Sequence, residues 1–479
     1  MSIDLKNLTI KKAHEALTRG DFTAVQLAGS YLKNIEEKNP SLNAYLEVFD
    51  DVLSQAEKAD KRIKEGRAAL LTGIPMAIKD NIMIEGRKVS AASKILENYT
   101  AAYDATVIRK LKEAGAVFLG RTNMDEFAMG SSTENSAFGV TKNPHDTSRV
   151  AGGSSGGGAA AVAADMALAA LGSDTGGSIR QPASFCGVVG LKPTYGAVSR
   201  YGLIALGSSL DCIGPLAKTV EDARIIFDCI KGKDEFDGTS VDFTKELSAI
   251  PDTISFTATK NFLGAVDLKD LREQTLESYS KACDTLSAAG FHYKTAEFQG
   301  PTAFDYSLPA YYIIMPAEAS ANLARFDGVK YGLYKGGEAL LDDYGKTRAF
   351  GFGEEVRRRI LVGAYVLSHG YYDAYYNKAQ KIRTLIKETF NNLFKEADVV
   401  IWPTTPTAAW KIGEKKDPVS VYLSDIFTVS ANIAGIPAIS VPFGEVEVNG
   451  KRLPLGVQLM ASYGRENILF EVAAKLLKF

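Results

Sequence analysis

Strand-like apolar segments occur near both ends of the chain, and helical patterns lie between them. From residue 105 onward the two patterns alternate, with a helical run at 106–114 followed by an apolar strand at 116–120. Strand patterns return at 399–402, 438–442 and 455–460. Alternation of this kind favours an α/β domain built around a central sheet. Because strands distant in sequence must share that sheet, we predict an α/β fold: a single large domain, residues 1–479, with a central mixed β-sheet covered by helices.

The predicted domain has three parts. Residues 1–65 form an N-terminal helical part, residues 70–215 form the core that carries the candidate catalytic side chains, and residues 251–479 supply the remainder of the sheet. In the first part, Thr23 caps a helix at 24–37 that Asn39-Pro40 is expected to end.

Three further segments carry specific expectations. The small side chains of 159–171 predict a helix that can pack closely against the sheet, and helical patterns extend over 353–394. The uncharged run 426–444 contains serine, asparagine, glycine and proline. We therefore interpret it as a buried strand with turns rather than a membrane span.

Composition excludes several classes of function. The 479 residues include 55 Lys and Arg against 57 Asp and Glu, so no sign of charge dominates, and extensive binding to nucleic acid or membrane surfaces by this chain alone is not indicated. The N-terminal residues lack the apolar core of a signal peptide, and the four cysteines form no close CxxC pair, so we expect a cytoplasmic protein with reduced thiols. The four histidines have no metal-ligand spacing, and no metal site is expected.

Three reactive side chains lie in glycine-rich or apolar surroundings. Lys79 ends an apolar strand, Ser154 lies in Gly-Gly-Ser-Ser-Gly-Gly-Gly, and Ser178 follows Gly-Gly. A serine nucleophile needs a base and donors for the oxyanion. The backbone amides of Thr175, Gly176, Gly177 and Ser178 can supply those donors. With no histidine in any of these motifs, a lysine made neutral by burial is the natural base.

Each of these features alone has a more ordinary explanation. A Gly–Ser stretch is more often a flexible loop or a phosphate cradle, although this one lacks the P-loop lysine and the GxGxxG spacing. A lysine that ends a strand is usually a surface residue whose charge reaches solvent. Only the combination of the three favours catalysis.

The combination resembles the amidase signature family. Gly-Gly-Ser-Ser-Gly-Gly at 152–157, Asp-Thr-Gly-Gly-Ser-Ile-Arg-Gln-Pro-Ala at 174–183, and the order Lys79, Ser154, Ser178 match its motifs over nearly the whole chain. The resemblance implies that Ser178 is the acyl-forming nucleophile. It also implies that Ser154, preceded by a cis peptide bond, passes the proton to Lys79.

Further segments, 120–139, 185–196, 317–328 and 368–376, resemble a branch of the family that serves tRNA-dependent amidotransferases. This resemblance implies hydrolysis of glutamine to release ammonia. It also implies two other subunits, of B and C type, and mischarged tRNA bound mainly through a partner. The chain itself then needs no cofactor, because a partner uses ATP and Mg²⁺ to convert Glu-tRNA(Gln) to Gln-tRNA(Gln), Asp-tRNA(Asn) to Asn-tRNA(Asn), or both.

The same resemblance assigns a glutamine-binding side within 251–479. A free amino acid needs a cation for its carboxylate and an anion for its ammonium group. The resemblance gives these roles to Arg358 and Asp425. From the residues alone, Arg358 is one of three consecutive arginines and fits a solvated helix face, and Asp425 fits an N-cap or a strand boundary.

Other functions stay open at this point. A stand-alone amidase of small amides would share the serine and lysine motif. A non-catalytic scaffold subunit would not need Lys79, Ser154 and Ser178 together, and a phosphate-binding module is the weakest alternative.

Overall fold

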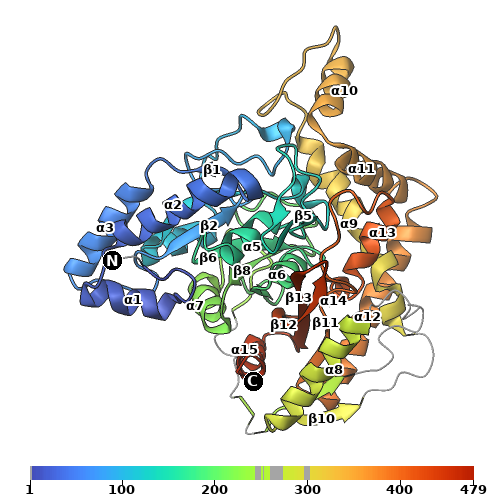
Figure 1. Cartoon of the computed structure of the whole chain (residues 1–479). Helices are drawn as coiled ribbons and strands as arrows, with labels where there is room; N and C mark the ends of the chain where they lie inside the picture. The colour runs from blue at the N-terminus through green and yellow to red at the C-terminus, as the bar shows by residue number, and fades with distance from the viewer. Residues whose placement is uncertain (1–2, 243–249, 252, 259–272, 296–301, 479) are drawn as a thin grey trace.

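An eleven-stranded mixed sheet forms the centre of the computed structural model, which describes residues 3–478 except 243–249, 252, 259–272 and 296–301 (Figure 1). The strand order is β1-β3-β2-β6-β8-β7-β12-β13-β11-β9-β10. The strands are β1 Tyr45–Val48, β2 Pro75–Lys79, β3 Val117–Thr122, β6 Ala169–Asp174, β7 Val189–Lys192, β8 Cys212–Ala217, β9 Ser255–Ala258, β10 His292–Thr295, β11 Val399–Pro403, β12 Ala438–Val448 and β13 Lys451–Ala461. β2 pairs in parallel with β3 and β6, whereas β6 and β8 are antiparallel. The predicted α/β fold with one mixed central sheet is confirmed.

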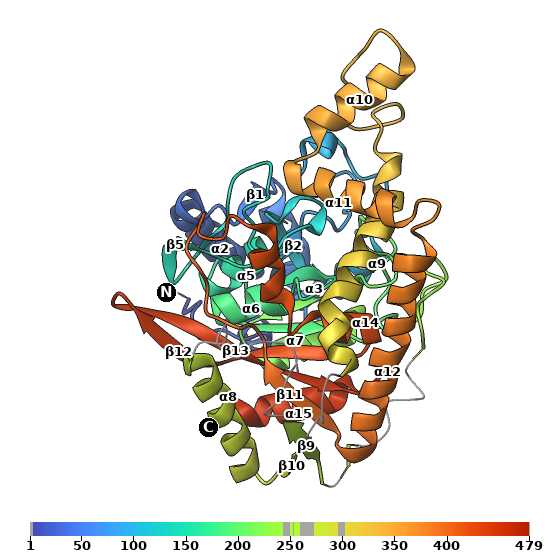
Figure 2. The same cartoon turned by 90° about the vertical axis from the view of Figure 1, so that its right-hand side faces the viewer.

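Helices cover the sheet. α1–α3 lie beside the strands from the first part of the chain, and α9, α11 and α12 lie at the opposite side of the molecule (Figures 1 and 2). Two further strands, β4 Lys142–Asn143 and β5 Asp146–Val150, form a separate hairpin. The helices are α1 Ile10–Arg19, α2 Ala24–Leu42, α3 Val52–Lys64, α4 Thr106–Ala114, α5 Gly156–Ala163, α6 Arg180–Cys186, α7 Val220–Ile230, α8 Glu273–Ala288, α9 Ser307–Asn322, α10 Leu340–Gly351, α11 Glu354–Val366, α12 Lys378–Glu396, α13 Pro418–Tyr422, α14 Val429–Ala434 and α15 Glu466–Leu476. In the described part of the chain, none is long and apolar enough to cross a membrane.

The small-residue helix α5 packs at the centre, as its composition predicts. A Cβ added at Gly157 would overlap the backbone oxygens of Asn123 and Ala44, so only glycine allows this approach. The prediction of one helix over 159–171 is wrong in its second half, because α5 ends at Ala163 and β6 begins at Ala169. Asp165 adopts a left-handed conformation, with φ 57°, and turns the chain from helix to strand.

Three other boundaries differ from expectation. α2 continues through Pro40 to Leu42, and the side-chain oxygen of Asn39 accepts hydrogen bonds from the amides of Ala44 and Tyr45 just beyond the end of the helix. The predicted helical stretch 353–394 is divided into α11 and α12, and Gly370, with φ 85°, lies between them. The run 426–444 contains the helix α14 before β12. Every residue of α14 is buried, so no amphipathic period marks it in the sequence.

Candidate active site

Lys79 ends β2 in the interior of the sheet, with 1% of its surface exposed. Its Nζ lies 2.8 Å from Ser154 Oγ and 2.8 Å from Ser155 Oγ. It also lies 2.9 Å from Ser173 Oγ and 3.2 Å from the Ser173 carbonyl oxygen. The amine is thus surrounded by hydroxyl and carbonyl groups that hold it in one position.

The environment of Lys79 favours its neutral form. Burial lowers the pKa of Lys79 to about 7, against the opposing effect of the carboxylates of Asp125, Asp174 and Asp211. Near neutral pH a substantial fraction of the amine is therefore unprotonated and can accept a proton from a hydroxyl group.

Ser154 lies in a loop in which the two preceding residues are hydrogen-bonded to two other segments. The Gly153–Ser154 peptide bond is cis. The Gly153 amide donates to Gln181 Oε1 at 2.9 Å, and the Gly152 carbonyl accepts from Thr133 Oγ1 at 2.7 Å. These bonds from two other segments fix the orientation of the loop that presents Ser154 to Lys79.

Ser178 lies in the turn between β6 and α6, with 8% of its surface exposed. Its carbonyl accepts from the Ser155 amide at 3.1 Å, which joins the two serine loops through their backbones. The Asp174 carboxylate accepts from the Gly177 amide at 2.8 Å and pairs with Arg180. The Gly177 amide is therefore already engaged, and the Thr175, Gly176 and Ser178 amides remain as candidate oxyanion donors.

The glycines before Ser178 are in contact with the opposite wall of the site. A Cβ on Gly176 would overlap the ring of Tyr311, and one on Gly177 would overlap the side chain of Thr428. Thr428 Oγ1 donates to the Gly176 carbonyl at 2.6 Å, and the Thr428 amide donates to the Asp425 carbonyl at 2.9 Å. This turn brings Asp425 to the neighbourhood of the serine loop.

Asp425 is almost completely buried, with 8% of its surface exposed. Its Oδ2 accepts from Ser131 Oγ at 2.8 Å and from the Tyr312 hydroxyl at 3.0 Å. Burial raises the pKa of Asp425 to about 6, so the carboxylate is ionised at neutral pH. The Ser131 carbonyl accepts from Gln181 Nε2 at 2.6 Å, so Gln181 contacts both this region and the Ser154 loop.

Arg358 lies on α11 beside a cavity of about 200 Å³, with 36% of its side chain exposed. Its guanidinium pairs with two residues of its own helix, Glu355 and Glu354, the latter at 2.7 Å. Ser178 and Asp425 are not among the residues that line this cavity. The structure thus places Arg358 on a partly exposed helix face with its charge already paired.

Sequence reasoning missed the aromatic and charged layer between Arg358 and Asp425. Arg359 is buried, donates to Glu355 at 2.9 Å, and lies over the rings of Tyr312 and Tyr422. The Tyr422 hydroxyl donates to Glu355 at 2.7 Å. The buried residues of α11 are Val356, Arg359, Gly363 and Val366. That helical spacing was a signal that could have identified Arg359 as the inward-facing arginine.

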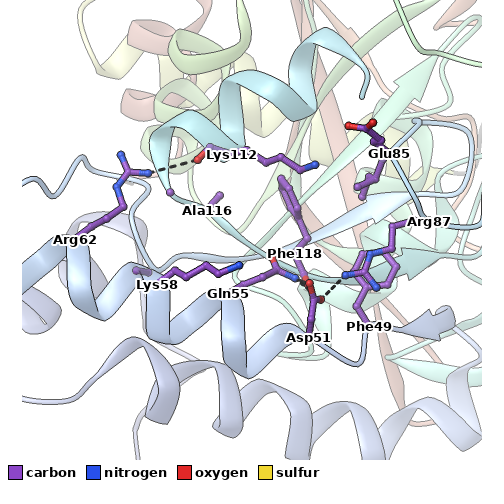
Figure 3. A pocket seen from close by; sticks show the side chains of 13 residues that line it. Phe49, Asp51, Gln55, Lys58, Arg62, Glu85, Arg87, Lys112, Ala116 and Phe118 are labelled. Carbon is purple, nitrogen blue, oxygen red and sulfur yellow. Dashed lines mark hydrogen bonds and ion pairs between the residues drawn. The ribbon is translucent and has the colours of Figure 1, made fainter. Parts of the chain in front are cut away.

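A second cavity, of about 500 Å³, lies between α3 and α4 (Figure 3). The residues that line it do not include Lys79, Ser154, Ser178, Arg358 or Asp425. Lys58, Arg62, Arg87 and Lys112 surround it, but Arg87 pairs with Asp51 and Lys112 with Asp104. In the segments that the structure describes, no group of His, Cys, Asp and Glu side chains is arranged to hold a metal ion.

Comparison with known proteins gives a consistent result. The Amidase family model matches residues 26–470. A protein of Microcystis aeruginosa, named as the A subunit of glutamyl-tRNA(Gln) amidotransferase, is 51% identical over 473 residues, 97% of this chain and 96% of that protein. A protein of the same name from Caldanaerobacter subterraneus subsp. tengcongensis is 50% identical over 479 residues, 98% of this chain and 96% of that protein.

Solved structures agree with these relatives. The crystal structure of the A subunit of glutamyl-tRNA(Gln) amidotransferase from Thermotoga maritima is 43% identical, has a TM-score of 0.81, and covers 100% of this chain and 96% of its own. A peptide amidase in complex with the inhibitor chymostatin is 29% identical, with a TM-score of 0.83, and covers 99% of this chain and 98% of its own.

Proposed function

The chain belongs to the amidase family, and we propose that it is the glutamine-hydrolysing subunit of a tRNA-dependent amidotransferase. It supplies ammonia for the conversion of Glu-tRNA(Gln) to Gln-tRNA(Gln), of Asp-tRNA(Asn) to Asn-tRNA(Asn), or of both. The observation that carries the proposal is the buried Lys79, which lies 2.8 Å from Ser154 Oγ beside the Ser178 loop. The names of the relatives that share half of its residues support the subunit role over a stand-alone amidase.

In the proposed reaction, Lys79 takes the proton of Ser154 while Ser154 takes that of Ser178. Ser178 Oγ attacks the side-chain carboxamide carbon, and the electron pair of the C=O bond moves to oxygen, where the Thr175, Gly176 and Ser178 amides bind it. The tetrahedral intermediate collapses, the proton returns through Ser154 to the nitrogen, and ammonia leaves. Water then cleaves the glutamyl ester by the same relay, giving glutamate and free Ser178.

Glutamine is proposed to bind with its ammonium group at Asp425 and its carboxylate at Arg358. Asp425 suits this role because its carboxylate is nearly buried and lies one turn from Thr428, which contacts the nucleophile loop. Arg358 has five N–H donors, and its two glutamate contacts leave others for a substrate carboxylate.

The word "subunit" in the relatives' names supports partner chains, which we propose to be of B and C type. ATP and Mg²⁺ act in a partner, mischarged tRNA binds mainly there, and this chain holds no cofactor of its own. The complex is proposed to work in the cytoplasm.

The test is release of ammonia from glutamine by the full chain, alone and co-purified with candidate partners, beside a Ser178→Ala control. Release that depends on Ser178 and rises with partners and mischarged tRNA is the expected result. Rapid hydrolysis of unrelated small amides by the chain alone, with no response to partners, would instead establish a stand-alone amidase.

A further inference from the structure

Asp125 is a buried carboxylate that the proposed proton path does not use. It follows β3 by three residues, and the last residue of β3, Thr122, is the register partner of Lys79. Its side chain has no exposed surface. Three backbone amides donate to it: those of Ser132 at 3.3 Å, Thr133 at 2.9 Å and Asn135 at 3.1 Å.

Asp125 contacts the Ser154 loop directly. A Cβ added at Gly153 would overlap the Asp125 carboxylate, so the two residues are in close van der Waals contact. The Asp125 amide donates to the Ser154 carbonyl at 3.3 Å. Thr133, whose amide donates to the Asp125 carboxylate, also donates through its Oγ1 to the Gly152 carbonyl at 2.7 Å. Asp125 therefore braces the backbone before and after the peptide that precedes Ser154.

Three carboxylates face Lys79 from different elements: Asp125 after β3, Asp174 at the end of β6, and Asp211 before β8. Asp174 has a counter-ion, because Arg180 lies 3.0 Å from it and both side chains are fully buried. Asp211 accepts from Thr175 Oγ1 at 2.6 Å and from two backbone amides.

Unlike the carboxylate of Asp174, that of Asp125 accepts its hydrogen bonds from neutral backbone amides. Burial raises the pKa of Asp125 to about 6, while the charge of Lys79 acts to lower it. Among the three carboxylates, Asp125 also has the largest effect on the pKa of Lys79. When both groups are ionised they therefore interact as opposite charges, and because both side chains are buried this attraction is stronger than it would be in water.

We propose that Asp125 is a positioning residue for amide hydrolysis, which fixes the Ser154 loop against Lys79 and stabilises the cation that Lys79 becomes when it accepts the proton. This rests on the proposed role of Lys79 as base. The Asp125 side chain contacts Gly153 and the backbone amides of Ser132, Thr133 and Asn135, so it acts through the loop and through the field at the amine.

The test compares pH profiles of the full chain carrying Asp125→Asn with those of the wild type, in complex with its partners where these are needed for activity. Removing the negative charge lowers the proton affinity of Lys79. The acid limb of kcat/KM is therefore expected to move down by about one pH unit. The maximal rate is expected to fall about 10- to 100-fold, because Ser154 is less well placed.

Glu126→Gln is the matched control. Glu126 is the next residue, is also buried, and accepts from the Gly353 amide at 2.8 Å, but it is not among the groups that shift the pKa of Lys79. The acid limb of kcat/KM for Glu126→Gln is expected to stay at the wild-type pH. An unmoved limb in Asp125→Asn, or an equal movement in both variants, would overturn the proposal.

Asp125→Glu separates charge from position and supplies a second test if Asp125→Asn does not fold. The longer side chain keeps the charge but cannot keep the contact with Gly153. Its acid limb is expected near that of the wild type, with a maximal rate reduced at least about tenfold. Wild-type maximal activity in this variant would refute the positioning role.

A second readout is independent of glutamine. A fluorophosphonate probe phosphonylates an activated serine with loss of fluoride, and the adduct on Ser178 is quantified by mass spectrometry. Its rate is expected to show the same movement of the acid limb. If glutamine is not hydrolysed but the labelling limb moves, the proposed substrate fails and the role of Asp125 stands. If glutamine is hydrolysed and neither limb moves, the role of Asp125 fails alone.

Discussion

The Lys79–Ser154 region and the Arg358 region differ in where their partners come from. Lys79 is fully buried and bonds to Ser154, 75 residues away in sequence. Arg358 is one-third exposed and pairs with Glu354 and Glu355, four and three residues away on the same helix. The first arrangement exists only when the sheet is formed, whereas the second needs only a helix. The position of the base is therefore fixed by the fold, whereas the proposed substrate-binding arginine is paired with glutamates of its own helix.

The largest expected effect comes from the nucleophile, at the centre of the preorganised region. Ser178→Ala removes the only atom that forms the acyl bond, so glutamine hydrolysis is expected to fall at least about 10⁴-fold. The measurement is ammonia release, with intact-mass detection of any acyl adduct. Residual hydrolysis within tenfold of the wild type would show that Ser178 is not the nucleophile.

The next effect distinguishes two neighbouring serines at the same distance from the base. Ser154 Oγ and Ser155 Oγ both lie 2.8 Å from Lys79 Nζ, but Ser155 Oγ also lies 3.1 Å from the Ser173 carbonyl oxygen. Ser154→Ala breaks the proposed relay, and kcat is expected to fall about 10³-fold. Ser155→Ala removes a supporting bond and is expected to cost about tenfold at most. The opposite order in kcat would assign the relay to Ser155.

At the second region, Arg358→Ala is expected to act on substrate binding rather than on chemistry. Loss of one charge-assisted contact to the glutamine carboxylate corresponds to a rise in KM of about 10- to 100-fold, with kcat changed much less. Arg357→Ala is the control, because Arg357 is the exposed neighbour on the same helix. Equal KM values for the two variants would remove Arg358 from the substrate site.

The sequence predicts residues in recognisable motifs better than residues whose role comes only from tertiary contacts. Lys79, Ser154 and Ser178 lie in motifs with unusual residue types, and these motifs could be read without knowing the fold. Asp125 and Tyr312 carry no such mark, because their importance arises from contacts with Gly153 and Asp425 that tertiary packing creates. Residue type cannot show which buried carboxylate will face a given lysine.

The boundaries of buried helices and strands were also hard to predict from the sequence. The segments 159–171 and 426–444 have no period that separates helix from strand, because α5, β6 and α14, which form within them, are almost completely buried. The change from α5 to β6 passes through a left-handed aspartate, Asp165. Aspartate is one of the few residue types other than glycine that adopt this conformation, but most aspartates do not, so its presence alone did not locate the boundary. The existence of the sheet was predictable from alternation, but these transitions depend on local contacts.

The dependence of kcat and KM on pH also distinguishes the two regions. Burial lowers the pKa of Lys79 to about 7 and raises the pKa of Asp425 to about 6. Below pH 7 the amine is increasingly protonated and cannot accept a proton, so kcat is expected to fall about tenfold per pH unit. Below pH 6 the Asp425 carboxylate is neutralised and loses its attraction for the glutamine ammonium group, so KM is expected to rise. Between pH 6 and 7 only kcat should change.

Separate determination of kcat and KM from pH 5 to 9 at constant ionic strength checks this order. Asp425→Asn is the informative variant, because it removes the ionisable group at the substrate while leaving Lys79 in place. Its KM is expected to be high and independent of pH, and its kcat is expected to keep the limb near pH 7. A KM that rises before kcat falls would mean that substrate recognition loses its charge first, and the assignment of the two limbs to Lys79 and Asp425 would have to be exchanged or abandoned.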